Sequence, residues 1–156
     1  MERQFTVTTP IGPLYITVFG GCVTRIAMSV NESVELADTL LDAEAYIKRQ
    51  IEEYFYNGRT AFDFPFEIRC GTPFQQRVWR ELCRIPFGTT GTYGDIAQRI
   101  GKRGAARAVG AACNRNPLLL VVPCHRVVGK GGGLVGFACG VEVKSRLLEI
   151  EGGCFV

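Results

Sequence analysis

Apolar and polar residues alternate near the start of the chain, as they do in strands that bury one face. The segment 5–30, FTVTTPIGPLYITVFGGCVTRIAMSV, contains the turn signals PIGP and GG and therefore predicts a small antiparallel sheet. From Ser33 to Tyr56 the apolar residues recur at helical spacing until Asn57-Gly58, which predicts a helix. With one more strand predicted for FDFPFEIR, residues 1–69 form an α/β unit.

The second half of the chain carries helical signals instead. Thr72-Pro73-Phe74-Gln75 has the form of a capping box with proline at the first helical position, and Thr92-Tyr93-Gly94-Asp95 begins a second helix in a similar way. A third segment, GAARAVGAACN, is poor in bulky side chains. Two short helices joined by a glycine-containing turn are typical of a helix-turn-helix. The small residues of GAARAVGAACN, the second helix of this pair, would permit close approach to DNA, but they would equally permit close packing against another helix.

A continuous aliphatic run precedes the chain's only histidine. Leu118 to Val122 predict a fully buried strand whose regular pairing loosens at Pro123. Cys124 and His125 follow directly, so the cysteine is expected at a strand end, where a nucleophile could be held rigidly. The alternatives are that the cysteine is an inert buried thiol and the histidine a structural residue.

Composition narrows the class of protein. The 156 residues are 47% hydrophobic, which is enough for a folded core. The chain has no membrane-length apolar stretch, and its start, MERQFTVTTP, lacks the features of a secretory signal, so we expect a cytoplasmic protein without a membrane partner. Seven cysteines without a C-x-x-C pair argue against a disulfide framework, and with one histidine they predict no metal site.

Charge is distributed unevenly between the two halves. Residues 1–69 hold 6 Lys/Arg and 10 Asp/Glu, whereas residues 70–156 hold 12 and 5, giving net charges of −4 and +7. This asymmetry favours an acidic partner for the second half, nucleic acid above all. A solvated basic surface is the alternative. The presumed recognition helix has few base-reading side chains, so any DNA contact should be weakly sequence-specific.

Seven sequence blocks between Gly71 and Gly152 resemble the O6-alkylguanine-DNA alkyltransferase family in order and spacing. They are GTPFQQRVW, IPFGTTGTYGDIA, AARAVG, NRNP, PCHRVV, GFACG and KSRLLEIEG. The resemblance implies a ribonuclease-H-like α/β domain over residues 1–69 and a mainly helical domain with a helix-turn-helix over residues 70–156. It also implies a monomer that binds double-stranded DNA in the minor groove, flips out O6-alkylguanine and takes the alkyl group irreversibly onto a cysteine.

The same resemblance assigns the reacting groups. Cys124 is the acceptor, and attack by a thiolate on a saturated carbon needs neither metal nor organic cofactor. His125 acts as base through a bridging water, and Glu151 orients it, following the logic of nucleophile, base and orienter. Tyr93 meets guanine N3 with its hydroxyl, and Asn116 orders the active-site turn. Such a network should hold Cys124 as a thiolate near neutrality, with its pKa below the usual value of about 8.5.

Two further sets of residues come from the resemblance. Arg107 occupies the space that the flipped base vacates, and GFACG at residues 136–140 replaces the usual Gly-Tyr-x-Gly-Gly, so the width of the pocket and its tolerance of bulky adducts stay open. The DNA-binding set is Tyr93, Ala106, Arg107 and Arg115, and the substrate pocket comprises Cys113, Val127, Phe137, Ala138 and Cys139.

Three other functions compete with alkyl transfer. A lesion-recognition protein of the alkyltransferase-like type carries another residue in place of the acceptor, so the presence of Cys124 favours transfer. A cysteine hydrolase using Cys124 and His125 would turn over repeatedly, whereas an alkyltransferase is consumed. A DNA-binding regulator would prefer one undamaged sequence.

Overall fold

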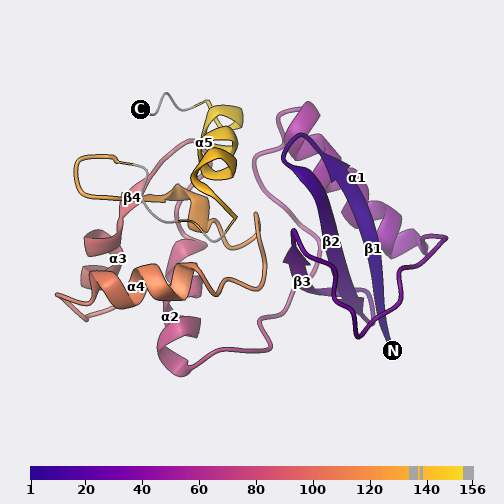
Figure 1. The fold of residues 1–156 in the computed structure, drawn as a ribbon, viewed down its shortest axis with the longest axis horizontal. Helices are drawn as coiled ribbons and strands as arrows, with labels where there is room; N and C mark the ends of the chain where they lie inside the picture. Colours follow the sequence, from indigo (N-terminus) through magenta and orange to yellow (C-terminus); the bar gives the residue numbers. More distant parts are fainter. Residues whose placement is uncertain (134–136, 138, 153–156) are drawn as a thin grey trace. The chain divides into compact units, whose positions relative to one another are not determined.

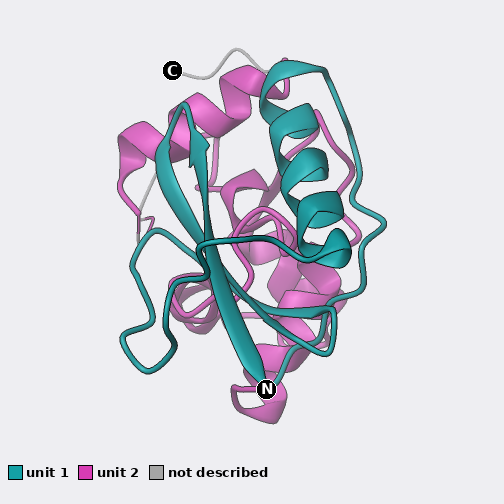
Figure 2. Cartoon of the chain, turned by 90° about the vertical axis from the view of Figure 1, so that its right-hand side faces the viewer, with its two compact units in different colours: residues 1–69 teal, residues 70–156 magenta. Residues whose placement is uncertain are grey.

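The chain folds into two compact units, Met1–Arg69 and Cys70–Val156, which Figure 2 colours separately. The computed structural model describes residues 1–133, 137 and 139–152 (Figure 1). The first unit combines a sheet with one helix, and the second is mainly helical. An α/β unit followed by a helical one is the coarse architecture that the sequence predicts.

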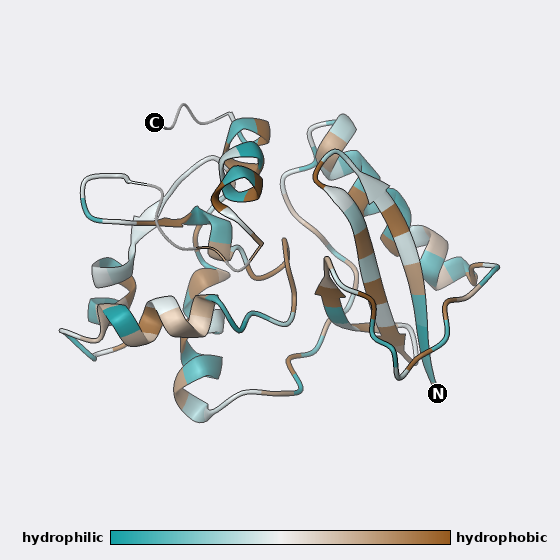
Figure 3. Cartoon of the chain, viewed as in Figure 1, coloured by the Kyte–Doolittle hydropathy of each residue, from teal (hydrophilic) through white to brown (hydrophobic). Residues whose placement is uncertain are grey.

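The predicted antiparallel sheet is confirmed. Strands β1 (Glu2–Thr9), β2 (Gly12–Phe19) and β3 (Cys22–Ala27) pair in the order β1-β2-β3. Apolar and polar bands alternate along β1 and β2 in Figure 3, as expected of strands with one buried face. Gly20 and Gly21 join β2 to β3 with φ values of 58° and 79°, a left-handed conformation that two-residue hairpin turns require.

Helix α1 spans Asp42–Tyr56, so the predicted helix start at Ser33 is wrong. The preceding segment lies beside β1 instead, because the Ala37 amide donates to the Gln4 carbonyl oxygen at 2.7 Å. The strand predicted for FDFPFEIR is also reduced, to a single bridge between Phe66 and Val23. In both segments, pairing with residues distant in sequence replaces the local pattern.

The second unit contains the helices whose starts were predicted. Helices α2 (Pro73–Leu82) and α3 (Tyr93–Arg99) both begin at a capping box, with Thr72 and Thr92 as the N-cap residues. The small-residue segment forms α4 (Ala106–Cys113), which is joined to α2 by a hydrogen bond of 2.8 Å from the buried Trp79 indole to the Ala112 carbonyl oxygen. Helix α5 (Val141–Ile150) is the last helix described.

The aliphatic run before the cysteine is a buried turn, so the strand predicted for Leu118–Val122 is wrong. The Val122 amide donates to the Leu118 carbonyl oxygen at 2.9 Å, and Leu120 takes a positive φ of 73°. Leu118, Leu120 and Val122 are all at least 97% buried. The prediction of burial was therefore correct, but continuous apolarity does not distinguish a strand from a buried turn.

Two short parallel strands connect the cysteine segment to α3. The 3₁₀ turn η1 (Cys124–Arg126) runs directly into β5 (Val127–Val128), which pairs with β4 (Gly91–Thr92). Strand β4 in turn leads directly into α3 at Tyr93. Cys124 therefore begins a 3₁₀ turn and does not end a strand, and this pairing holds it close to the start of α3.

Other features bear on the expected class of protein. None of the helices in the described part of the chain is long and apolar enough to cross a membrane. The described residues also contain no cluster of three or more His, Cys, Asp or Glu side chains that could hold a metal ion. Free thiols occur at Cys22, Cys70, Cys83, Cys113, Cys124 and Cys139.

Candidate active site

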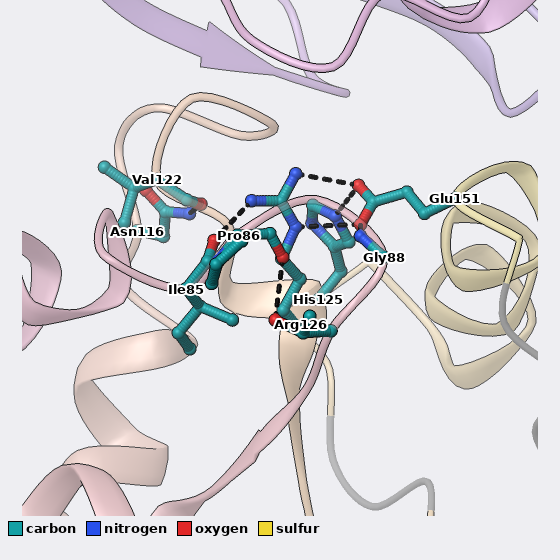
Figure 4. A network of polar contacts seen from close by, with 9 residues as sticks. Ile85, Pro86, Gly88, Asn116, Val122, His125, Arg126 and Glu151 are labelled. Carbon is teal, nitrogen blue, oxygen red and sulfur yellow. Dashed lines mark hydrogen bonds and ion pairs between the residues drawn. The ribbon is translucent and has the colours of Figure 1, made fainter.

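Cys124 is a buried thiol held by Asn116. The sulfur lies 3.1 Å from Asn116 Nδ2, and only 2% of the cysteine is exposed. The same Nδ2 donates to the Val122 carbonyl oxygen at 2.7 Å (Figure 4). Asn116 Oδ1 accepts from the Leu118 amide at 2.9 Å. Asn116 thus closes the buried turn and directs an N–H group at the sulfur, where it would stabilise a negative charge.

The expected low pKa of the Cys124 thiol is wrong. Burial raises its pKa to about 11, which outweighs the opposite effects of the Asn116 hydrogen bond and of the Lys144 charge. Burial disfavours a charged sulfur more than these two groups favour it. The resting residue is therefore a thiol, and it must lose its proton during the reaction.

His125 and Glu151 form a buried pair. Nε2 of His125 lies 2.7 Å from Oε2 of Glu151, and the two residues are 0% and 5% exposed. Burial lowers the pKa of His125 despite the opposing effect of Glu151, so the ring is neutral near pH 7. With the proton on Nε2 facing the carboxylate, Nδ1 is the acceptor nitrogen, and it has no hydrogen-bond partner among the described residues.

Arg126, which the sequence analysis missed, binds the same carboxylate. Its Nε lies 2.8 Å from Glu151 Oε1 and its Nη2 lies 3.0 Å from Oε2, while Nη1 donates to the Ile85 carbonyl oxygen at 2.7 Å (Figure 4). The Gly88 amide lies 3.4 Å from Oε1. The only sequence signal for Arg126 was its position within the PCHRVV block.

Lys144 is a second residue that the sequence analysis missed. The side chain is fully buried, and Nζ donates to the Tyr93 hydroxyl at 3.3 Å. Nζ also lies 5.5 Å from the centre of the Tyr93 ring and 5.9 Å from that of Phe137, as in cation–π contacts. Burial lowers the pKa of Lys144 and raises the pKa of Tyr93 to about 12. Lysines are seldom fully buried, so sequence gave little reason to single it out.

The remaining predicted residues fall into two groups. Arg107 and Arg115 are exposed, at the start of α4 and just after its end, and Ala106 beside Arg107 is partly exposed. On the pocket side, Val127 and Cys113 are buried, Phe137 and Cys139 are partly exposed, and Ala138 lies outside the described residues. Burial and the nearby Cys124 thiol raise the pKa of Cys113 to about 12.

The second unit matches a known protein family. Residues 73–153 match the family described as 6-O-methylguanine DNA methyltransferase, DNA binding domain. Over 152 residues the chain is 43% identical to the methylated-DNA–protein-cysteine methyltransferase of Mycobacterium leprae, covering 94% of this chain and 90% of that protein. The constitutive methylated-DNA–protein-cysteine methyltransferase of Bacillus subtilis is 42% identical, with 97% and 96% covered.

Solved structures show the same likeness. The Mycobacterium tuberculosis O6-methylguanine methyltransferase superposes with a TM-score of 0.87 at 41% identity, covering 97% of this chain and 93% of that one. For the Mycobacterium tuberculosis OGT in complex with DNA, the TM-score is 0.88 at 41% identity, with 96% and 92% covered. The similarity therefore extends over both units of the chain.

Proposed function

The chain belongs to the family of methylated-DNA–protein-cysteine methyltransferases, and we propose that Cys124 is the cysteine that accepts the alkyl group. It is a DNA-repair protein that transfers the alkyl group of damaged DNA to one of its own cysteines. The observation that supports Cys124 is its position in η1, bound by Asn116 and adjacent to the buried pair of His125 and Glu151.

The reaction begins from a neutral thiol and a neutral imidazole. As the sulfur forms its bond to the alkyl carbon, the bond from that carbon to guanine O6 breaks and its electron pair goes to the base. The thiol proton moves to His125 Nδ1 through a bridging water molecule, which also satisfies a buried nitrogen. Glu151 then stabilises the imidazolium, and Asn116 stabilises the charge that develops on sulfur.

The departing guanine carries the negative charge that balances the imidazolium. The Tyr93 hydroxyl faces guanine N3 and stabilises the negative charge that develops there by hydrogen bonding. Lys144 supports this role, because its ammonium donates to the phenol oxygen and leaves the phenol proton for the base. The backbone of Val127 contacts the base edge, while Cys113, Phe137 and Cys139 line the pocket. The thioether that forms on Cys124 has no hydrolysable bond, so each molecule reacts once.

DNA recognition belongs to the second unit. Helices α3 and α4 form the helix-turn-helix, and the exposed Arg107 and Arg115 lie on or beside α4. Ala106 allows close approach to the minor groove. The first unit has ribonuclease-H-like topology. The substrate is double-stranded DNA with a flipped-out O6-alkylguanine, and the protein acts as a cytoplasmic monomer. A lesion-binding protein without transfer is not favoured, because the relatives are named methyltransferases and Cys124 is present.

Stoichiometry tests the proposed function. Incubation with excess duplex containing O6-methylguanine is expected to add one methyl group per protein molecule, on the peptide that carries Cys124. Intact mass spectrometry measures the number of methyl groups added, and peptide mass spectrometry locates the modified cysteine. An unmethylated duplex of the same sequence is the control. Release of more product than protein present would indicate a hydrolytic reaction instead.

Arg107 provides a test of base flipping. Arg107→Ala is expected to slow methyl transfer from duplex DNA by roughly 10- to 100-fold, because the gap left by the flipped guanine is no longer filled. Transfer from the free base O6-benzylguanine should change little, since no gap has to be filled. Single-turnover rates on the two substrates measure this difference. Arg99→Ala, which removes an exposed arginine from α3, is the matched control. Equal losses on duplex and free base would exclude the flipping role of Arg107.

A further inference from the structure

The buried guanidinium of Arg126 takes no part in the proton path described above. Arg126 is only 8% exposed, and it meets both oxygens of Glu151, at 2.8 and 3.0 Å (Figure 4). Because the guanidinium is planar, two parallel hydrogen bonds fix the plane of the carboxylate. The direction in which Glu151 faces His125 is therefore set largely by Arg126.

A second set of contacts fixes Arg126 itself. Nη1 donates to the Ile85 carbonyl oxygen at 2.7 Å, and the guanidinium lies 5.8 Å from the centre of the Phe87 ring. Gly88, in the same turn, has a φ of +80°, and a Cβ added there would come within 3.3 Å of the Glu151 carbonyl oxygen. Glycine thus lets the turn approach the end of α5 closely, and Arg126 joins the two.

We propose that Arg126 is a positioning residue of the transfer reaction, which fixes Glu151 so that Glu151 can orient His125. The inference rests on the proposed roles of Cys124 and His125. Arg126 touches neither the guanine nor the reacting carbon, and it acts through Glu151. The paired hydrogen bonds from Nε and Nη2 to Glu151, here called the fork, and the hydrogen bond from Nη1 to the Ile85 carbonyl oxygen together keep the carboxylate from rotating.

The fork also decides where the proton stops. Oε1 of Glu151 faces Arg126 Nε and the Gly88 amide, and Oε2 faces Arg126 Nη2 and His125 Nε2. Hydrogen bonds from so many N–H donors stabilise the ionised carboxylate. The proton that leaves Cys124 therefore remains on the imidazole, and Glu151 stays charged throughout, as the carboxylate of a catalytic triad does.

The charge of Arg126 opposes protonation of the base. Among the described residues, the ionisable groups around His125 are Lys144 of α5, Glu151 at its C-cap, and Arg126 and Cys124 of η1, while Cys83 after α2 faces Arg126. Glu151 raises the pKa of His125, whereas Arg126 and Lys144 lower it. Transfer requires neutral His125, so its rate falls as pH falls through this pKa. Removing the charge of Arg126 raises the pKa, and the loss of rate then begins at higher pH.

The test is a pH profile of single-turnover transfer from a duplex containing one O6-methylguanine, with rates expressed per folded molecule. Arg126→Gln is expected to slow transfer by roughly 10- to 100-fold at neutral pH and to move the acidic limb of the profile to higher pH. Arg126→Lys keeps the charge but cannot form the fork, so it should be slower than the wild type with the acidic limb unmoved.

Arg59→Gln is the matched control, because Arg59 makes a similar set of contacts in the first unit. Its Nε lies 3.1 Å from Glu53 Oε1, and its Nη1 donates to the Ala61 carbonyl oxygen at 2.9 Å. This variant should transfer at the wild-type rate. Wild-type rate and an unmoved acidic limb in Arg126→Gln would overturn the proposal and leave Arg126 a purely structural role. Failure of the wild-type protein to methylate Cys124 would instead overturn the proposed function.

Discussion

Replacement of Cys124 by serine is expected to abolish methyl transfer while leaving DNA binding largely intact. A serine hydroxyl is a far weaker nucleophile toward a saturated carbon than a thiol, so the rate should fall by roughly 10⁴-fold or more. The smaller side chain fits the same buried position, and Asn116 Nδ2 can donate to its oxygen. Peptide mass spectrometry after incubation with methylated duplex measures transfer, and fluorescence polarisation measures binding.

Cys70→Ser is the control for this experiment. Cys70 is an exposed thiol in the same unit, whereas Cys124 is only 2% exposed. Non-specific alkylation would therefore favour Cys70, and transfer from a bound and flipped guanine would favour Cys124. Cys70→Ser should accept one methyl group at the wild-type rate. A methyl group on Cys70 or Cys139 in the Cys124→Ser variant would contradict the assignment.

The parts of the fold that could be predicted are those fixed by neighbouring residues. The starts of α2 and α3 follow from Thr72 and Thr92, each of which caps an amide three residues later. The paired glycines Gly20 and Gly21 similarly mark the hairpin between β2 and β3. In each case the physical cause lies within four residues, so the sequence pattern is sufficient.

The wrong predictions concern segments whose conformation depends on tertiary contacts. The helix predicted from Ser33 fails because Gln4, from the first strand, binds the segment that precedes α1. The strand predicted from Leu118 fails because the run packs on all sides as a turn, which Asn116 closes through its side chain. Hydrophobicity correctly indicated that the Leu118–Val122 run would be buried, but it did not fix the backbone conformation of either segment.

The candidate site was predicted unevenly for a related reason. The resemblance identified Cys124, His125 and Glu151, and the structure brings His125 and Glu151 into contact although 26 positions separate them. Arg126 and Lys144 were missed because a charged residue in a sequence is normally solvated, and only the fold shows that these two are buried. The same burial explains why the thiol of Cys124 is neutral at rest.

Glu151→Leu is expected to destabilise the protein strongly as well as to slow transfer. The change leaves the Arg126 guanidinium and the His125 Nε2–H group buried without their carboxylate. Breaking a buried ion pair by removing one partner costs about 3–5 kcal/mol of unfolding free energy. Urea denaturation measures this loss. The control is Glu53→Leu, which removes the carboxylate of a partly exposed pair and should cost about 1 kcal/mol or less.

Removing the guanidinium as well should separate stability from activity. In the Arg126→Met/Glu151→Leu variant no buried charge is left unpaired, and apolar replacements of a whole buried pair are often neutral. We therefore expect most of the unfolding free energy lost in Glu151→Leu to return. Transfer should stay slow, because His125 still lacks the acceptor that orients its ring. Recovery of the transfer rate together with stability would show that the Glu151 carboxylate serves the fold alone, whereas stable but slow protein would show that its charge serves the reaction.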